Sequence, residues 1–249
     1  FIQFVAALIV VIGGVGIKSV TNPIGTPFIL DQYNFVLNLG SYSVSISLLA
    51  TLFTMIWIVL LMNTMNFLDG LNGLPSGVTT IAAGILFMLS IRPHFHAIDQ
   101  NTFALLSIIL ASTTFAFWFF DFYPAKILMG DTGSMFLGFI LATLAIFSGG
   151  KIATAFLVMG FPILDTFWVI LRRILNKQSP FKGDLKHLHH RLLEAGFSER
   201  KALVLIYFLC GLFGIMAVFL DSFLKLFAIF FLLLAMTIIG FWSIKKKKI

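Results

Sequence analysis

The chain has 249 residues, of which 59% are hydrophobic and only 11% are charged. So few polar residues cannot cover a soluble globule of this size, and the composition therefore predicts an all-α integral membrane protein. The formal net charge of +7 does not indicate a nucleic-acid partner, because the basic residues lie in loops and at one terminus without a basic face interleaved with aromatic residues. The single cysteine, Cys210, lies in an apolar run, which excludes a disulfide framework and a thiolate metal site.

Eight stretches approach the roughly 20 apolar residues that a membrane-spanning helix needs. The third and fifth are short, and we expect their helices to tilt slightly or to begin inside the preceding loop. The chain opens in the first stretch without a Met or a basic leader, so we expect an N-terminally truncated form of a larger helical bundle. The eight stretches are Phe1 to Val20, Ser45 to Met62, Gly77 to Ile91, Thr102 to Phe119, Ser134 to Ser148, Ile152 to Leu171, Ala202 to Leu220 and Phe223 to Ser243.

The connections between these stretches differ strongly in charge. If the first stretch crosses from inside to outside, the loops on one side carry thirteen Lys and Arg residues, and those on the other side carry four. Basic residues favour the cytoplasmic side, so the richer side is predicted to be cytoplasmic. On the opposite side, Thr21 to Val44 contains Pro, Gly and alternating apolar residues, which are typical of a small hairpin.

Asn63 to Gly73 is the first of three polar loops on the predicted cytoplasmic side. It contains Asn63, Asn66 and Asp69 between two apolar stretches. Polar groups this close to a membrane segment are costly and are often functional. Taken alone, the loop could equally be a helix cap and a set of turn residues.

The second polar loop runs from Asp121 to Ser134 and leads directly into the fifth apolar stretch. Backbone N–H groups at a helix start attract anions. Asp131 beside them could hold a hard cation such as Mg²⁺, and Lys126 lies in the same loop. The alternative is that Asp131 only caps the helix.

The third polar loop contains His187, His189, His190 and Arg191. If this segment is helical, His187, His190 and Arg191 share one face. A cationic cluster that binds phosphate explains the residues better than zinc, because no Cys or suitably spaced carboxylate accompanies them. Asp165, inside the sixth apolar stretch, is expected to pair with a basic residue or to line the site.

Four motifs in order resemble the polyprenyl-phosphate N-acetylhexosamine-1-phosphate transferases of glycosyltransferase family 4, and the resemblance runs from Gln3 onward. Residues 1–249 would then form one polytopic transferase domain, similar to bacterial undecaprenyl-phosphate GlcNAc-1-phosphate transferases. The matching strings run from Asn63 to Leu74, from Pro124 to Ser134, from Pro162 to Thr166 and from His187 to Arg191.

The resemblance implies roles for these residues. Asp69 and Asp131 would be catalytic and would hold Mg²⁺, or Mn²⁺ in its place. The substrates would be a UDP-N-acetylhexosamine and undecaprenyl phosphate, bound at the cytoplasmic face of a bacterial inner membrane. The protein could also form a homodimer. The residues that would bind substrate are Asn63, Asn66, Lys126, His187, His189, His190 and Arg191.

Three departures from the family pattern keep other interpretations open. The adjacent Asp-Asp pair that the family usually carries in an earlier loop does not occur in this sequence. Asn72 stands where the family commonly has Asp, so it cannot serve as an acid or base, and Asp121 stands where Asn is common. An inactive or partial homologue that acts through partners is one alternative. A lipid-linked sugar transporter is another, but it would need polar residues nearer the middle of the membrane.

Overall fold

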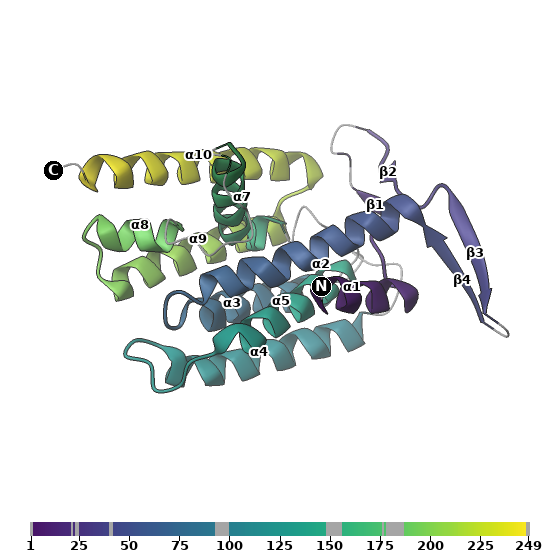
Figure 1. Cartoon of the computed structure of the whole chain (residues 1–249), viewed down its shortest axis with the longest axis horizontal. Helices are drawn as coiled ribbons and strands as arrows, with labels where there is room; N and C mark the ends of the chain where they lie inside the picture. The colour runs from purple at the N-terminus through teal and green to yellow at the C-terminus, as the bar shows by residue number, and fades with distance from the viewer. Residues whose placement is uncertain are drawn as a thin grey trace.

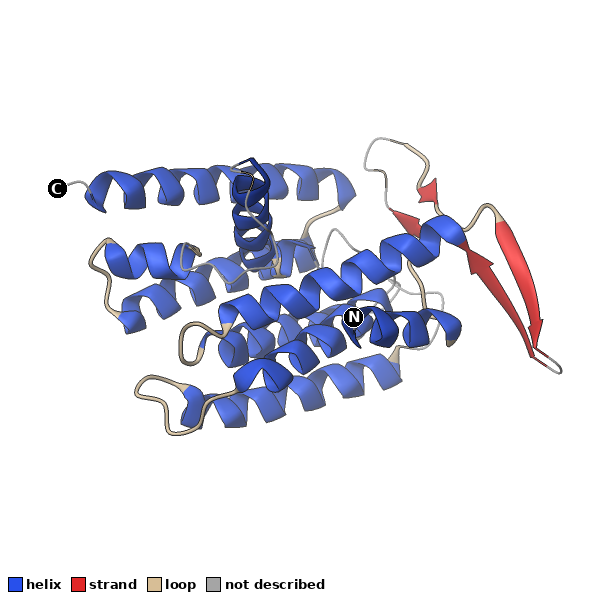
Figure 2. Cartoon of the chain, in the orientation of Figure 1, coloured by secondary structure: helices blue, strands red, loops and turns tan. Residues whose placement is uncertain are grey.

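The computed structural model describes residues 2–20, 22, 25–39, 42–92, 100–147, 156–175, 177 and 187–247. Within these residues the chain forms helices and two small antiparallel sheets (Figure 2). The helices are α1 (Ile2–Ile12), α2 (Leu48–Leu68), α3 (Leu74–Ser90), α4 (Asn101–Asp121), α5 (Gly130–Phe147), α7 (Gly160–Leu175), α8 (Leu188–Glu194), α9 (Glu199–Phe219) and α10 (Ser222–Lys247). The strands are β1 (Ser19–Val20), β2 (Phe28–Ile29), β3 (Asn34–Leu39) and β4 (Tyr42–Ser47).

The prediction of an all-α membrane protein is confirmed. Five helices, α2, α4, α5, α9 and α10, are long and apolar enough to cross a membrane, and α1 and α3 are shorter apolar helices. Large apolar side chains such as Leu48, Phe119 and Phe230 are exposed on the outer faces of these helices, as expected of surfaces that face lipid. The helix α7 runs across the direction of the others (Figure 1).

The first apolar stretch is shorter as a helix than the sequence predicted. α1 ends at Ile12, and Gly14 follows with a φ of +84°, a backbone conformation that favours glycine. The chain then returns to α2, where the Ile17 N–H donates to Thr54 Oγ1 at 2.9 Å. The prediction that this helix continues to Val20 is therefore wrong.

The segment that follows α1 contains the predicted hairpin. β1 pairs antiparallel with β2, and β3 pairs antiparallel with β4, in a register that places Asn34 opposite Ser47. Both sheets lie at the end of the helix bundle opposite the α2–α3 and α4–α5 connections (Figure 1). The small hairpin expected within Thr21 to Val44 is confirmed, although it consists of two separate sheets and reaches Ser47.

The first polar loop begins later, and the second ends earlier, than the sequence predicted. α2 continues to Leu68, so Asn63 and Asn66 are helical rather than loop residues. α3 begins at Leu74 and α5 at Gly130, which confirms that the two short stretches start inside their loops. Asp131 consequently lies in the first turn of α5.

Close packing of α5 against α2 brings the two predicted carboxylate motifs together. Gly138 of α5 lies directly on the α2 backbone, because an added Cβ would stand 2.5 Å from the Leu61 carbonyl oxygen and 2.7 Å from Met62 Cα. Nearby, the Trp57 indole N–H donates to the Ala142 carbonyl at 3.2 Å. No side chain fits at position 138 without moving one helix away from the other.

We predict that Gly138→Ala destabilises the protein, because the new methyl group collides with backbone that cannot move independently. Overpacking of this kind costs about 1–3 kcal/mol. The melting temperature of the detergent-solubilised protein should fall by about 2–4 °C for each kcal/mol lost. The matched control is Gly84→Ala in α3, where an added Cβ has nothing within 4 Å. Equal melting temperatures for the two variants would contradict this account.

Candidate active site

The end of α2 and the start of α5 meet through polar side chains. The Asn66 amide Nδ2 donates to Asp131 Oδ1 at 2.9 Å and lies 3.4 Å from Ser134 Oγ. Ser134 is buried, and its hydroxyl lies 3.1 Å from the Gly130 carbonyl oxygen. The contact orients the Asp131 carboxylate toward the α2–α3 loop and joins two motifs that are 65 residues apart in sequence.

The α2–α3 loop also touches the histidine segment. A Cβ added to Gly70 would stand 2.9 Å from Nε2 of His189 and 3.3 Å from Nε2 of His190. The two histidine rings lie against each other with centroids 4.2 Å apart. The missing side chain at Gly70 is therefore what allows the loop that carries Asp69 to approach the histidines.

Asp69 lies at the end of α2 in an unfavourable electrostatic position. Burial, followed by the nearby Asp121 and Asp131 carboxylates, raises the pKa of this carboxyl from 3.8 to about 6. A hydrogen bond with the Gly130 backbone opposes the rise. Three carboxylates thus gather at one end of the bundle, and a cation there would relieve their repulsion.

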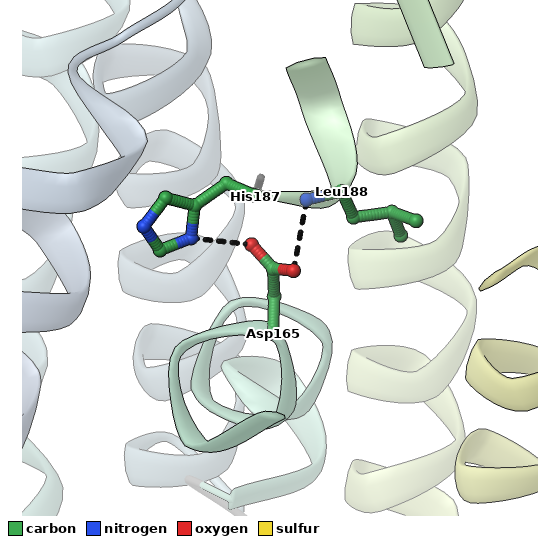
Figure 3. Close-up of polar contacts among 3 residues, drawn as sticks. All are labelled: Asp165, His187 and Leu188. Carbon is green, nitrogen blue, oxygen red and sulfur yellow. Dashed lines mark hydrogen bonds and ion pairs between the residues drawn. The ribbon is translucent and has the colours of Figure 1, made fainter. Parts of the chain in front are cut away.

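Asp165 of α7 holds the beginning of the histidine segment (Figure 3). Its Oδ2 lies 2.9 Å from Nδ1 of His187, and its Oδ1 accepts the Leu188 N–H, also at 2.9 Å. The pairing with Asp165 holds His187 at the N-cap position, directly before α8. His187 is therefore not part of the helical face that the sequence predicted for it with His190 and Arg191.

The histidines differ in exposure and hence in what they can do. His189 is 1% exposed, and burial, followed by the neighbouring His190 and His187, lowers its pKa to about 3. It is neutral at physiological pH, and its buried Nε2 has no hydrogen-bond partner among the described residues. His190 is only partly buried. A uniformly cationic cluster is therefore wrong for His189, although a neutral imidazole still offers one N–H donor.

The other predicted substrate-binding residues lie around this centre. Asn63 donates through Nδ2 to Gln3 Oε1 at 2.9 Å, which ties α1 to α2. Lys126 is exposed in the α4–α5 loop, and Arg191 is half-buried in α8. Their roles toward substrate stay predictions.

Sequence reasoning treated Asp121 only as a departure from the family pattern, whereas the structure places it beside the site. Asp121 is 1% exposed, and its Oδ2 accepts the Ser76 hydroxyl at 2.6 Å. The available signal was a carboxylate at the end of a long apolar stretch, because such a group needs a partner when it is buried. The sequence did not indicate a role for Ser76, since serine is a common residue at the start of a helix.

The donor set fits a hard cation. Asp69, Asp131 and Asn66 offer carboxylate and amide oxygens, the ligands that Mg²⁺ takes together with water and substrate phosphates. Among the described residues, no group of three or more His, Cys, Asp or Glu side chains is placed to hold a metal ion. The fit therefore rests on the chemistry of the Asp69, Asp131 and Asn66 oxygens.

Comparison with known proteins agrees with this geometry. Residues 1–149 match the model for the family described as "Glycosyl transferase family 4". A Bacillus subtilis protein named "Probable undecaprenyl-phosphate N-acetylglucosaminyl 1-phosphate transferase" is 38% identical over 196 aligned residues, and the alignment covers 75% of this chain and 53% of that relative.

Two further relatives match with lower identity. A Mycolicibacterium smegmatis "Decaprenyl-phosphate N-acetylglucosaminephosphotransferase" is 34% identical over 232 aligned residues, and the alignment covers 84% of this chain and 53% of the relative. A Borreliella burgdorferi "Phospho-N-acetylmuramoyl-pentapeptide-transferase" is 31% identical over 191 aligned residues, and the alignment covers 71% of this chain and 53% of the relative. The chain spans about half the length of these relatives. With its family match and its converging polar motifs, the chain belongs to glycosyl transferase family 4.

Proposed function

We propose that this protein transfers an N-acetylhexosamine-1-phosphate, GlcNAc-1-phosphate in the first instance, from a UDP-sugar to undecaprenyl phosphate. A lipid phosphate oxygen forms a bond to the phosphorus that carries the sugar, and the bond from that phosphorus to the UMP oxygen breaks. The products are UMP and a lipid-linked diphosphate sugar that starts a cell-envelope glycan. The reaction is placed at the cytoplasmic face of the inner membrane.

One observation carries the proposal: the Asp69 loop lies between the Asp131 carboxylate and the histidine segment. Asn66 holds Asp131 at 2.9 Å on one side, and Gly70 faces His189 and His190 on the other. Carboxylates beside imidazoles, at the end of a helix bundle, suit a diphosphate that needs both a cation and N–H donors. The names of the relatives support the polyprenyl phosphate acceptor.

The two reacting phosphates repel each other, and so do the carboxylates around Asp69. Two unit charges ~4 Å apart repel by about 4 kcal/mol at an effective dielectric constant near 20. Mg²⁺ bound there would offset this repulsion and polarise the phosphoryl oxygen. We assign Asp131 and Asp69 as its ligands, with Mn²⁺ as an alternative ion.

The histidine segment is assigned to the donor substrate. His190 and Arg191 supply N–H groups for the charge that moves onto the departing UMP phosphate. Asp165 keeps His187 and the start of α8 in place. No general base is required, because a phosphate monoester has a second pKa near 6 and is mostly dianionic at neutral pH.

The deciding experiment is a UMP-release assay on the complete purified protein with UDP-GlcNAc, undecaprenyl phosphate and Mg²⁺ in detergent. Release should require both substrates and should stop when EDTA is added. A panel of UDP-sugars then identifies the hexosamine. A protein that binds the lipid but releases no UMP with any member of the panel would be a transporter or an inactive homologue, and the proposal would fail.

We predict that Asp131→Asn abolishes Mg²⁺-dependent UMP release, because the amide keeps the shape of the side chain but loses its charge. Expression and melting temperature should stay close to those of the unchanged protein, since Asp131 is exposed. Asp31→Asn, at the end of the molecule that holds the sheets, is the matched control and should retain activity. Full activity in Asp131→Asn would refute the metal assignment.

We predict that His190→Ala mainly weakens the use of the nucleotide sugar. Loss of one donor to a developing charge reduces kcat/KM by about 10²–10³-fold. Steady-state kinetics with varied UDP-GlcNAc measures this loss. Ser198→Ala serves as the control, because Ser198 is exposed and makes no side-chain cap hydrogen bond. Unchanged kcat and KM would remove His190 from the site.

We predict a pH-dependent gain in stability from Asp69→Asn. The folded pKa of about 6 lies above the ordinary 3.8, so the stability linked to protonated Asp69 is present at low pH and is lost as pH rises through about 6. In EDTA, the unchanged protein should lose melting temperature between pH 5 and 7.5, and Asp69→Asn should lose about 2–4 °C less. Parallel curves for the two proteins would contradict the raised pKa.

A further inference from the structure

The Asp69 loop ends at Gly73, a residue whose backbone conformation is unusual. Gly73 precedes α3 with a φ of +84°, which favours glycine. A Cβ there would also stand 3.3 Å from Phe122 and 3.4 Å from the Tyr207 hydroxyl oxygen. The end of the loop is thus enclosed by Tyr207 of α9 and by Phe122, the residue that follows α4.

Tyr207 of α9 holds the carbonyl group of Gly73. Its hydroxyl donates to the Gly73 oxygen, across 134 residues of sequence. The same hydroxyl accepts the indole N–H of Trp118 at 3.0 Å. Because the phenol oxygen both donates and accepts, its orientation is determined from two sides.

α3 leaves space for the Tyr207 ring at Gly77. A Cβ at that position would stand 2.3 Å from Cζ and from the hydroxyl oxygen of Tyr207. The ring therefore lies directly on the helix backbone, one turn after Gly73. On the other side, the Gly73 amide faces the buried Asp121 carboxylate, which also accepts the Ser76 hydroxyl at 2.6 Å.

These contacts act on the same loop that the histidines touch at Gly70. Between the two ends, Leu71 is buried and its N–H donates to the Leu68 carbonyl at 3.4 Å. Because the Asp69–Gly73 loop is short and is held at both ends, Asp69 has little freedom to move. The Gly73 carbonyl also accepts the Gly77 N–H at 3.0 Å and the Ser76 hydroxyl at 3.1 Å, both from the first turn of α3. Tyr207 is the donor that comes from another helix, so loss of its hydroxyl removes the tie between this end of the loop and α9, while the ring continues to fill the space beside Gly77.

We propose that Tyr207 is a positioning residue that acts through the Gly73 carbonyl to hold the Asp69–Gly73 loop, and with it the Asp69 carboxylate, in its working place. This inference rests on the proposed sugar-phosphate transfer for its kinetic consequence, but not for its structural one. We assign Tyr207 no direct contact with substrate or metal. Its effect reaches the reaction only through the loop.

The variant Tyr207→Phe removes the hydroxyl and keeps the ring. A displacement of about 1 Å in a reacting geometry can lower rates by about 10²-fold, so kcat for UMP release should fall by about 10- to 100-fold. KM for UDP-GlcNAc should stay within about twofold, because the histidine segment is unchanged. Amide hydrogen exchange of residues 70–74 should become faster in the same variant, whereas exchange in the second half of α3 should not change.

Thr114→Val is the matched control, because it deletes a buried hydroxyl that bonds to Thr80 at 3.0 Å in the α3–α4 interface and not between α9 and the loop. It should retain kcat and the exchange rates of residues 70–74. An equal loss of kcat in Thr114→Val would show general loosening and would overturn the proposal, as would unchanged exchange of residues 70–74 in Tyr207→Phe. If the unchanged protein releases no UMP, the proposed transfer fails, and the exchange measurement alone still decides the role of Tyr207.

Discussion

Lipid cannot hydrogen-bond to a polypeptide backbone, and this constraint shapes the whole molecule. Most of the described chain is helical, and the helices present apolar side chains outward. Polar chemistry is then confined to the places where helices end. The α2–α3 connection, the start of α5 and the start of α8 are such places, and the contacts of Asn66 and Gly70 bring them together.

The three elements are held together by polar contacts between helices rather than within them. Asp165 joins α7 to the start of α8, Asn66 joins α2 to α5, and Tyr207 joins α9 to the loop before α3. The Asp165 contact is buried and the Tyr207 contact is partly buried, and their polar groups would be costly to leave unpaired away from water. The candidate site therefore requires that several helices pack in the correct register, and it cannot be assigned to a single one.

Much of the fold could be predicted from the sequence because a helix needs a minimum number of apolar residues to cross the lipid. The apolar stretches that became α4, α9 and α10 were placed to within a few residues. The first stretch was misjudged because composition does not reveal that Gly13 and Gly14 end a helix within an apolar run. The extent of the first polar loop was misjudged because Asn63 and Asn66 have polar partners within the bundle, which allows them to remain helical.

The residues of the candidate site were visible in the sequence, but their arrangement was not. Because Asp165 lies within an apolar stretch, the sequence indicated that its carboxylate needs a partner. That the partner is His187 depends on the direction of α7, which no local sequence pattern encodes. Tyr207 gave no signal at all, because a single tyrosine in an apolar helix usually reads as part of the core. Contacts over 134 residues of sequence follow from packing and not from periodicity.

The bare backbone at Gly70 has a consequence for how such a protein can change. The distance between the carboxylate loop and the histidine rings is set by a single hydrogen atom on Gly70, since even a methyl group would reach 2.9 Å from His189. The size of the side chain at position 70 therefore limits the size of the side chains at positions 189 and 190, and the reverse also holds. A variant with a larger side chain at position 70 would therefore need smaller or displaced side chains at positions 189 and 190.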